Sequence, residues 1–121
     1  MSDNKITIVI VDDDAGVLKA LTLMVSVAVN AQLHPFQDAR KALIWLEENH
    51  TATDYILSDL RMPEMSGTAF FEQCHLRWPE LKFILMSGHA DQYDASEALN
   101  KGMYAFLGKP FSADEVQALI L

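Results

Sequence analysis

The chain has 121 residues, a hydrophobic content of 50% and a formal net charge of −8. This length predicts one compact domain with its own core, and the single cysteine, Cys74, excludes an internal disulfide. The acidic charge disfavours direct nucleic-acid binding, because a phosphate backbone requires Lys and Arg. We find no signal peptide and no apolar stretch of the roughly 20 residues that a membrane span needs, so we expect a cytoplasmic domain outside the membrane.

Apolar runs and helical patterns alternate from the first residues to the last. We predict strands near 5–11, 32–36, 54–59, 82–87 and 104–108, and helices over about 15–30, 38–49, 66–77, 92–101 and 112–121. The first, third and fourth strands are nearly continuous apolar runs, which is typical of strands covered on both faces. Strict alternation of strand and helix predicts an α/β fold with a parallel sheet and right-handed crossovers.

Capping residues support these helix boundaries. Asp38 and Ser66 stand where the second and third helices should begin, and Pro79 follows the end of the third. Ser112 with Glu115 three residues later forms a capping box at the start of the fifth helix.

The first predicted helix is unusually apolar. Between residues 15 and 31 the polar positions recur at helical spacing, so that a narrow polar stripe faces water; these positions are Lys19, Thr22, Ser26 and Asn30. Two interpretations of the remaining apolar surface stay open. Most of it is core, or part of it is a docking patch for a partner helix.

The chain ends on the apolar residues Leu119, Ile120 and Leu121. Such an end is unusual for a natural terminus. We therefore expect residues 1–121 to form one domain and any output domain to lie outside this chain.

Charged residues stand where three predicted strands end. Asp12, Asp13 and Asp14 close the first strand, Asp59 closes the third, and Lys109 follows the fifth. Because parallel strands bring their carboxyl ends to one edge of the sheet, these side chains should converge in a single crevice. Clustered carboxylates repel one another unless a cation joins them, so the sequence predicts a bound divalent metal.

Four segments at these strand ends carry a resemblance to a known family. They are Val9 to Asp14, Ser58 to Gly67, Ile84 to His89 and Phe106 to Phe111. Together and in this order, they make the chain similar to the receiver domain of two-component response regulators along essentially its whole length. The resemblance implies a doubly wound five-stranded parallel sheet with the flavodoxin-like strand order 2-1-3-4-5.

The resemblance also implies the chemistry of the crevice. It makes Asp59 the phosphoryl acceptor, which attacks the phosphorus of a phosphohistidine and forms an acyl phosphate. Asp12 and Asp13 match the acidic pair that holds Mg²⁺ or Mn²⁺, with Asp59 and the backbone carbonyl of Arg61 as further ligands. Lys109 would pair with one phosphoryl oxygen as a compact positive charge.

A conformational switch follows from the same resemblance. Ser87 matches the hydroxyl residue that binds the phosphoryl group, and Phe106 matches the aromatic residue that changes rotamer when this hydroxyl moves. The surface of the fourth helix, fifth strand and fifth helix then changes. Phe106 is apolar where some members carry Tyr. Arg61 and His89 flank the site and are expected to tune the acyl-phosphate lifetime.

The implied function is a signalling switch that is phosphorylated by a sensor histidine kinase or a histidine phosphotransfer protein. It catalyses phosphoryl transfer to itself and its own dephosphorylation only, and is not an enzyme with an outside substrate. We expect the donor to dock near the acidic edge and the first helix. We also expect an output domain or target on which the switch acts, and homodimerisation stays open.

Three other functions fit parts of the sequence. A phosphorylation-independent pseudo-receiver fits the fold, but all five expected site residues are present. A phosphatase of the haloacid dehalogenase type uses an Asp-x-Asp pair, which Asp12 and Asp14 mimic, but Gly16 stands where Thr or Val is expected and the chain has no room for a cap. A flavodoxin-like electron carrier lacks its phosphate loop, since acids here would repel the FMN phosphate.

Overall fold

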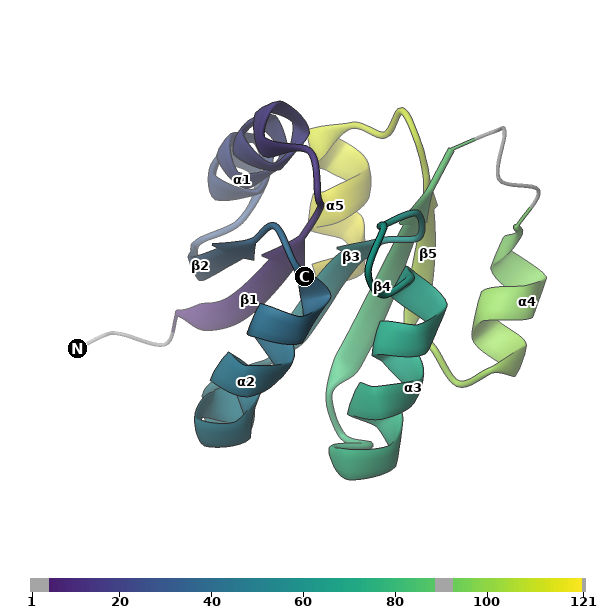
Figure 1. The fold of residues 1–121 in the computed structure, drawn as a ribbon. Coiled ribbons are helices and arrows are strands. Elements are labelled where there is room, and N and C mark those ends of the chain that lie inside the picture. The colour runs from purple at the N-terminus through teal and green to yellow at the C-terminus, as the bar shows by residue number, and fades with distance from the viewer. Residues whose placement is uncertain (1–4, 89–92, 121) are drawn as a thin grey trace.

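The computed structural model describes residues 5–88 and 93–120. Five strands form one parallel sheet in the order β2-β1-β3-β4-β5, which confirms the predicted doubly wound order (Figure 1). The strands are β1 (Ile6–Val11), β2 (Ala31–Phe36), β3 (Tyr55–Asp59), β4 (Lys82–Ser87) and β5 (Ala105–Gly108). The helices are α1 (Ala15–Ala28), α2 (Ala39–Asn49), α3 (Gly67–Arg77), α4 (Ala95–Asn100) and α5 (Ala113–Ile120), with a short 3₁₀ helix, η1 (His50–Ala52), before β3.

Helices cover both faces of the sheet, which explains the continuous apolar strands. Figure 1 shows α2 and α3 on one face and α1 with α5 on the other, while α4 lies beside β5. Along β1, Ile8 and Ile10 pack in the core under α1 and α5, whereas Val9 and Val11 pack in the core under α2 and α3. Alternate side chains of one strand therefore enter two different cores, and both must be apolar.

Two helices are shorter than the sequence predicts. The first helix ends at Ala28 rather than near residue 30, because Val29 is already extended (φ −140°, ψ 152°) and the chain enters β2 at Ala31. The fourth helix begins at Ala95 rather than near residue 92, and position 92 itself lies outside the described residues. Asp94 is the N-cap of α4, since its side chain accepts a hydrogen bond from the Glu97 amide at 2.9 Å.

The predicted caps are present. Asp38 accepts from the Arg40 amide at 2.9 Å, and Ser66 accepts from the Ala69 amide at 3.2 Å. At the start of α5 the Ser112 amide donates to the Glu115 carboxylate at 3.0 Å and the Glu115 amide donates to the Ser112 hydroxyl at 3.2 Å. Each cap satisfies backbone donors that the first helical turn leaves unpaired.

Helix α1 buries only part of its apolar surface. Leu18, Leu21 and Val25 face the core, but Leu23 is 67% exposed and Val27 is 77% exposed. The surplus therefore includes an exposed apolar surface, as the docking interpretation requires. None of the helices in the described residues is long and apolar enough to cross a membrane.

Candidate functional site

Three carboxylates meet at the carboxyl edge of the sheet. Asp12 directly follows β1 and Asp59 ends β3, and the pairing of Val11 with Ser58 brings these two aspartates to neighbouring positions. One carboxylate oxygen each from Asp12, Asp13 and Asp59 lies within 4.8 Å of the others. Asp12 and Asp59 are buried (2% and 9% exposed), whereas Asp13 is exposed. The convergence that the sequence predicts is therefore present.

The loop after β1 holds these acids in distinct orientations. The Asp14 amide donates to Oδ1 of Asp12 at 3.0 Å, and the side-chain amide of Gln37 donates to the Asp13 carbonyl at 3.4 Å. The carboxylate of Asp14 accepts from the Val17 amide at 3.0 Å and so caps α1. Asp14 is thus occupied as a helix cap and stays outside the three-carboxylate group.

Lys109 supplies a cation to this group. Its ammonium nitrogen lies 2.9 Å from Oδ1 of Asp59 and 3.5 Å from Oδ2 of Asp12. The Lys109 amide donates to the carbonyl of Ser87 at 2.7 Å, which fixes the backbone at the ends of β4 and β5, and the Lys109–Pro110 peptide bond is cis. One partly buried lysine therefore bridges the ends of β1, β3 and β5.

The single positive charge of Lys109 does not neutralise the three carboxylates at the site. Burial raises the pKa of Asp59, and the charge of Asp12 raises it further, while the hydrogen bond and charge of Lys109 oppose the shift without cancelling it. Burial disfavours the charged form of Lys109, but the hydrogen bond to Asp59 and the two carboxylates outweigh this, so the pKa of Lys109 is raised. The three carboxylates are hard oxygen donors whose negative charge exceeds the single positive charge of Lys109, which fits Mg²⁺ or Mn²⁺.

The remaining predicted site residues lie around this crevice. Ser87 ends β4 and is 1% exposed, and Phe106 on β5 is half-buried with its ring centroid 6.3 Å from that of Tyr93. Arg61 is exposed in the loop after β3; its carbonyl as a metal ligand stays a prediction. His89 lies outside the described residues, so its role also stays a prediction.

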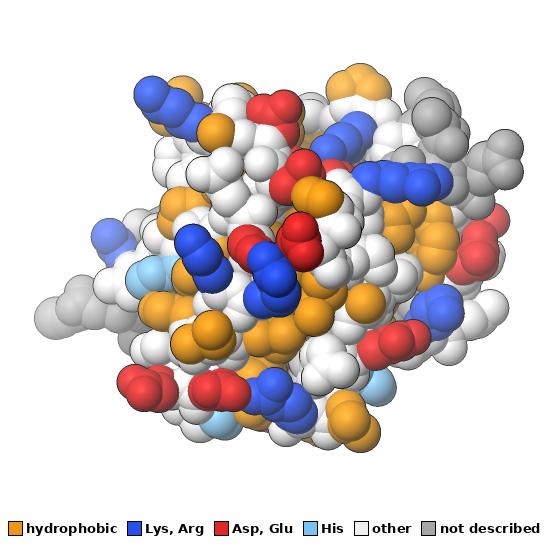
Figure 2. Space-filling model, in the orientation of Figure 1, with side chains coloured by type: hydrophobic (Ala, Val, Ile, Leu, Met, Phe, Trp, Pro, Cys, Tyr) orange, Lys and Arg blue, Asp and Glu red, His pale blue; other side chains and the backbone are white. Residues whose placement is uncertain are grey.

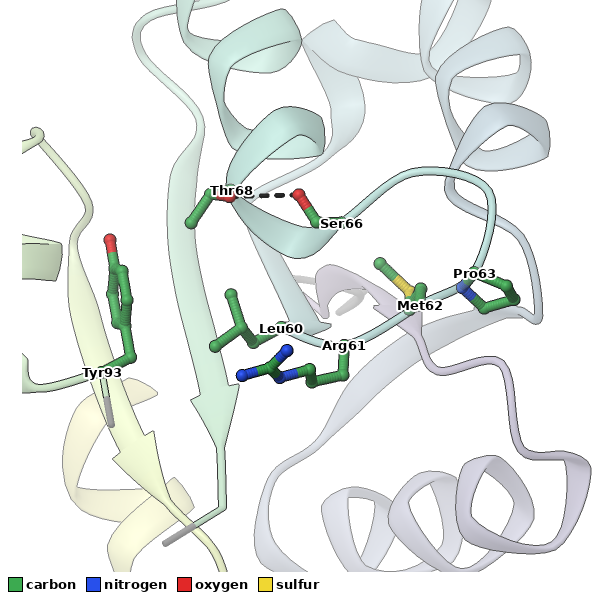
Figure 3. Close-up of a pocket in the computed structure, with 7 residues that line it drawn as sticks. All are labelled: Leu60, Arg61, Met62, Pro63, Ser66, Thr68 and Tyr93. Atoms are coloured by element: carbon green, nitrogen blue, oxygen red, sulfur yellow. Dashed lines mark hydrogen bonds between the residues drawn. The ribbon is translucent and has the colours of Figure 1, made fainter. Parts of the chain in front are cut away.

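A groove of about 540 Å³ includes Leu60, the residue that follows Asp59 in the chain. The β3–α3 loop and the first turn of α3 form one wall, and Tyr93 stands on the other side (Figure 3). In Figure 3 the side chain of Arg61 lies below that of Leu60. On the face seen in Figure 2, acidic and basic side chains are intermixed rather than gathered into one basic patch.

Gly67 is a site residue that the sequence analysis did not single out. A Cβ at this position would overlap the carbonyl oxygen of Asp59 and lie 2.8 Å from a methyl carbon of Leu85. The Gly67 amide donates to the Leu60 carbonyl at 2.8 Å, so α3 begins pressed against the end of β3. A glycine directly after a Ser N-cap was the signal available. Tyr93 was also missed, and a lone aromatic residue in a polar stretch gives no such signal.

Comparison with known proteins gives a consistent result. Residues 8–121 match the family described as the response regulator receiver domain. The C4-dicarboxylate transport transcriptional regulatory protein DctD of Rhizobium meliloti is 34% identical over 110 residues, which are 91% of this chain and 23% of that protein. The DNA-binding transcriptional regulator NtrC of Salmonella typhimurium is 34% identical over 111 residues, covering 92% of this chain and 23% of that protein.

The chain therefore spans 23% of the length of either relative. Among solved structures, a response regulator receiver domain protein from Clostridium thermocellum superposes with a TM-score of 0.88, covering 95% of this chain and 90% of that one. The sequence identity in this pair is 23%, so the likeness concerns the fold alone.

Proposed function

Because this chain belongs to the response regulator receiver family, we propose that it is a signalling switch that accepts a phosphoryl group on Asp59 and changes its surface in response. The observation that carries this proposal is the position of Asp59 at the end of β3, beside the buried Asp12 and in contact with the partly buried Lys109. A domain of this kind is regulatory. It modifies only itself and does not turn over an outside substrate.

The transfer step uses one oxygen of Asp59 as the nucleophile. This oxygen forms a bond to the phosphorus of a phosphohistidine while the phosphorus–nitrogen bond breaks, and the electron pair of that bond stays on the imidazole nitrogen. Phosphoryl transfer depends mainly on positioning and on charge neutralisation. Lys109 already lies 2.9 Å from Asp59, so its ammonium is in place to pair with a phosphoryl oxygen.

The three carboxylates would hold the metal that this reaction needs. Asp12, Asp13 and Asp59 supply the side-chain oxygens, and the Arg61 carbonyl completes the proposed protein ligands. When bound, Mg²⁺ or Mn²⁺ neutralises charge on the transferring phosphoryl group. Asp12 has a second task, because its buried carboxylate is held by the Asp14 amide and so keeps a fixed orientation toward Lys109.

Signal output would depend on Ser87 and Phe106. Ser87 is buried at the end of β4, where its hydroxyl can turn toward a phosphoryl group on the adjacent strand. The shift of Ser87 would open space for the half-buried ring of Phe106 and alter the surface of α4, β5 and α5. Arg61 and His89 are proposed to tune the lifetime of the acyl phosphate.

The proposed phosphodonor is a sensor histidine kinase or a histidine phosphotransfer protein. A helix of the donor would pack on the exposed apolar side chains of α1, beside a groove of about 470 Å³ that includes Leu23 and Pro35. DctD and NtrC are described as transcriptional regulators. We infer that this receiver likewise controls a separate output domain or target.

Intact-mass analysis after incubation with acetyl phosphate tests the proposal. We expect a single phosphoryl adduct on the wild-type protein with Mg²⁺, and none after metal removal or in Asp59→Asn. Failure to form an adduct under any condition would contradict the proposal and favour a phosphorylation-independent interaction module.

A further inference from the structure

Tyr93 lies next to Phe106, the proposed switch residue. It precedes Asp94, the N-cap of α4, and lines the groove that also includes Leu60, the residue after Asp59 (Figure 3). Its ring centroid is 6.3 Å from that of Phe106, with the two ring planes at 34°. Phe106 therefore has an aromatic neighbour on the α4 side in the arrangement seen here, which we call the resting arrangement.

The hydroxyl of Tyr93 is buried but unpaired. Within residues 5–88 and 93–120, its oxygen is the buried side-chain polar atom that has no hydrogen-bond partner. The other two tyrosines differ, because Tyr55 donates to the carbonyl of Ile120 at 3.4 Å and Tyr104 donates to that of Leu119 at 3.3 Å. A buried hydroxyl without a partner destabilises the arrangement that contains it.

Acidic residues act electrostatically on this hydroxyl without accepting a hydrogen bond from it. Burial raises the pKa of Tyr93, and the carboxylates of Glu97, Asp94 and Glu72 add to the shift. Any displacement of the ring that brought the hydroxyl to water or to one of these carboxylates would therefore give it the partner it lacks.

We propose that Tyr93 is a positioning residue for Phe106, whose ring supports the resting arrangement and whose unpaired hydroxyl limits the stability of that arrangement. The inference rests on the proposed function, since it assumes that phosphorylation moves Phe106 away from Tyr93. When Phe106 moves inward, the Tyr93 ring is released and its hydroxyl gains a partner. Phe106 itself carries no hydroxyl, but the neighbouring Tyr93 does. Because the Tyr93 hydroxyl has a hydrogen-bond partner only in the switched arrangement, it favours that arrangement.

For Tyr93→Phe we predict higher thermal stability and weaker ligand binding. The substitution removes a buried unpaired hydroxyl and so stabilises the resting arrangement, and the unliganded protein should therefore melt at a higher temperature. A ligand that selects the switched arrangement must then overcome a larger resting population, so it should bind more weakly. Beryllofluoride with Mg²⁺ is a suitable ligand, because it mimics a phosphoryl group on an aspartate.

The experiment measures both quantities for the wild type and for Tyr93→Phe, with Tyr55→Phe as the matched control. We expect Tyr93→Phe to raise the melting temperature and to raise the half-saturating beryllofluoride concentration by about tenfold. Tyr55→Phe removes a paired hydroxyl far from the site, so its melting temperature should fall or stay level while half-saturation is unchanged.

The inference is overturned if Tyr93→Phe melts no higher than the wild type, or if it melts higher without weaker beryllofluoride binding, since the second result would make its role purely structural. A wild-type protein that gives no beryllofluoride response would instead contradict the proposed function, and this inference with it. Amide chemical shifts of β5 and α4 report which arrangement each variant occupies.

Discussion

The ammonium nitrogen of Lys109 lies 2.9 Å from Oδ1 of Asp59, and this contact joins the ends of the third and fifth strands across β4. The pair is only partly shielded, with the Lys109 side chain 29% exposed and that of Asp59 12% exposed. Lys109 is therefore a positive charge in direct contact with two buried carboxylates, those of Asp12 and Asp59. The predictions for Lys109 and Asp59 depend on the charges of these three side chains.

Replacing Lys109 with Ala should leave metal binding largely intact and weaken the switch. Without metal, the variant should be less stable by roughly 1–3 kcal/mol, because the Asp12 and Asp59 carboxylates lose their partner. Mg²⁺ should then restore stability at concentrations similar to those for the wild type, while the response of β5 and α4 to beryllofluoride falls. Thermal melts with and without Mg²⁺, together with amide chemical shifts, measure both effects.

Lys101 offers a matched control for this test, because it is an exposed lysine after α4 and away from the carboxylates. Lys101→Ala should behave as the wild type in both measurements. Loss of Mg²⁺ binding in Lys109→Ala, or an unchanged conformational response, would contradict the role assigned to Lys109.

Replacing Asp59 with Asn should stabilise the metal-free protein near neutral pH, by on the order of 1 kcal/mol. The pKa of Asp59 is raised by burial and by Asp12, so the folded protein binds this proton more tightly than the unfolded chain does. The unfolding free energy of the wild type therefore falls as pH rises from the ordinary value of 3.8 through the raised folded pKa. Asn does not titrate, so the variant avoids this loss.

Urea denaturation in EDTA at several pH values measures the difference. The gain in Asp59→Asn should be largest above the raised pKa and should shrink as pH falls toward 3.8. A variant that is less stable than the wild type near neutral pH would show that the Lys109 ion pair outweighs burial and repulsion at this site.

Replacing Asp38 with Ala should destabilise the protein by about 1 kcal/mol, because α2 loses its N-cap. The side-chain hydrogen bond from Arg40, with its backbone hydrogen bond, lowers the pKa of Asp38 to about 2. A lowered pKa stabilises the fold above the unfolded value of 3.8 and this contribution disappears as pH falls toward 2. The charge contribution is small, since the Arg40 side chain is exposed to solvent.

Asp38→Asn is the control, because asparagine caps helices nearly as well as aspartate. It should retain most of the stability near neutral pH and should lack the pH dependence between 3.8 and about 2. Equal destabilisation by Ala and Asn, measured from urea midpoints, would assign the effect to the ion pair rather than to the cap.

Replacing Gly67 with Ala should destabilise the protein by about 1–3 kcal/mol and should slow phosphorylation, because the new methyl group overlaps the Asp59 carbonyl. Gly16→Ala is the matched control within α1, where the added Cβ would be 3.4 Å from Oδ1 of Asp14, an ordinary contact. That change should be neutral or stabilising by up to about 1 kcal/mol, because alanine favours helices. Similar destabilisation in both variants would refute the close approach at Gly67.

The sequence predicted the sheet well, because its local signals agree with the tertiary structure. Apolar runs of the length of a strand, caps such as Asp38 and Ser66, and charged residues at strand ends all indicate the same parallel sheet. Register then brings Asp12, Asp59 and Lys109 together without further information, since parallel strands end at a common edge.

Other features depend on packing that the sequence does not express. The early end of α1 at Ala28 depends on where β2 must begin, and the need for glycine at position 67 depends on how closely α3 approaches the Asp59 carbonyl. Tyr93 is a further example, because its contact with Phe106 and its unpaired hydroxyl arise only when β5 and the start of α4 are placed side by side.

The location of the phosphoryl group is the most direct test of the account. After incubation with acetyl phosphate and Mg²⁺, reduction with borohydride converts a phosphorylated aspartate to homoserine, which peptide sequencing by mass spectrometry can assign to one position. We predict homoserine at position 59 alone, with Asp12 and Asp13 unmodified. Homoserine at position 12 or 13, or none at any position, would contradict the assignment of Asp59 as the phosphoryl acceptor.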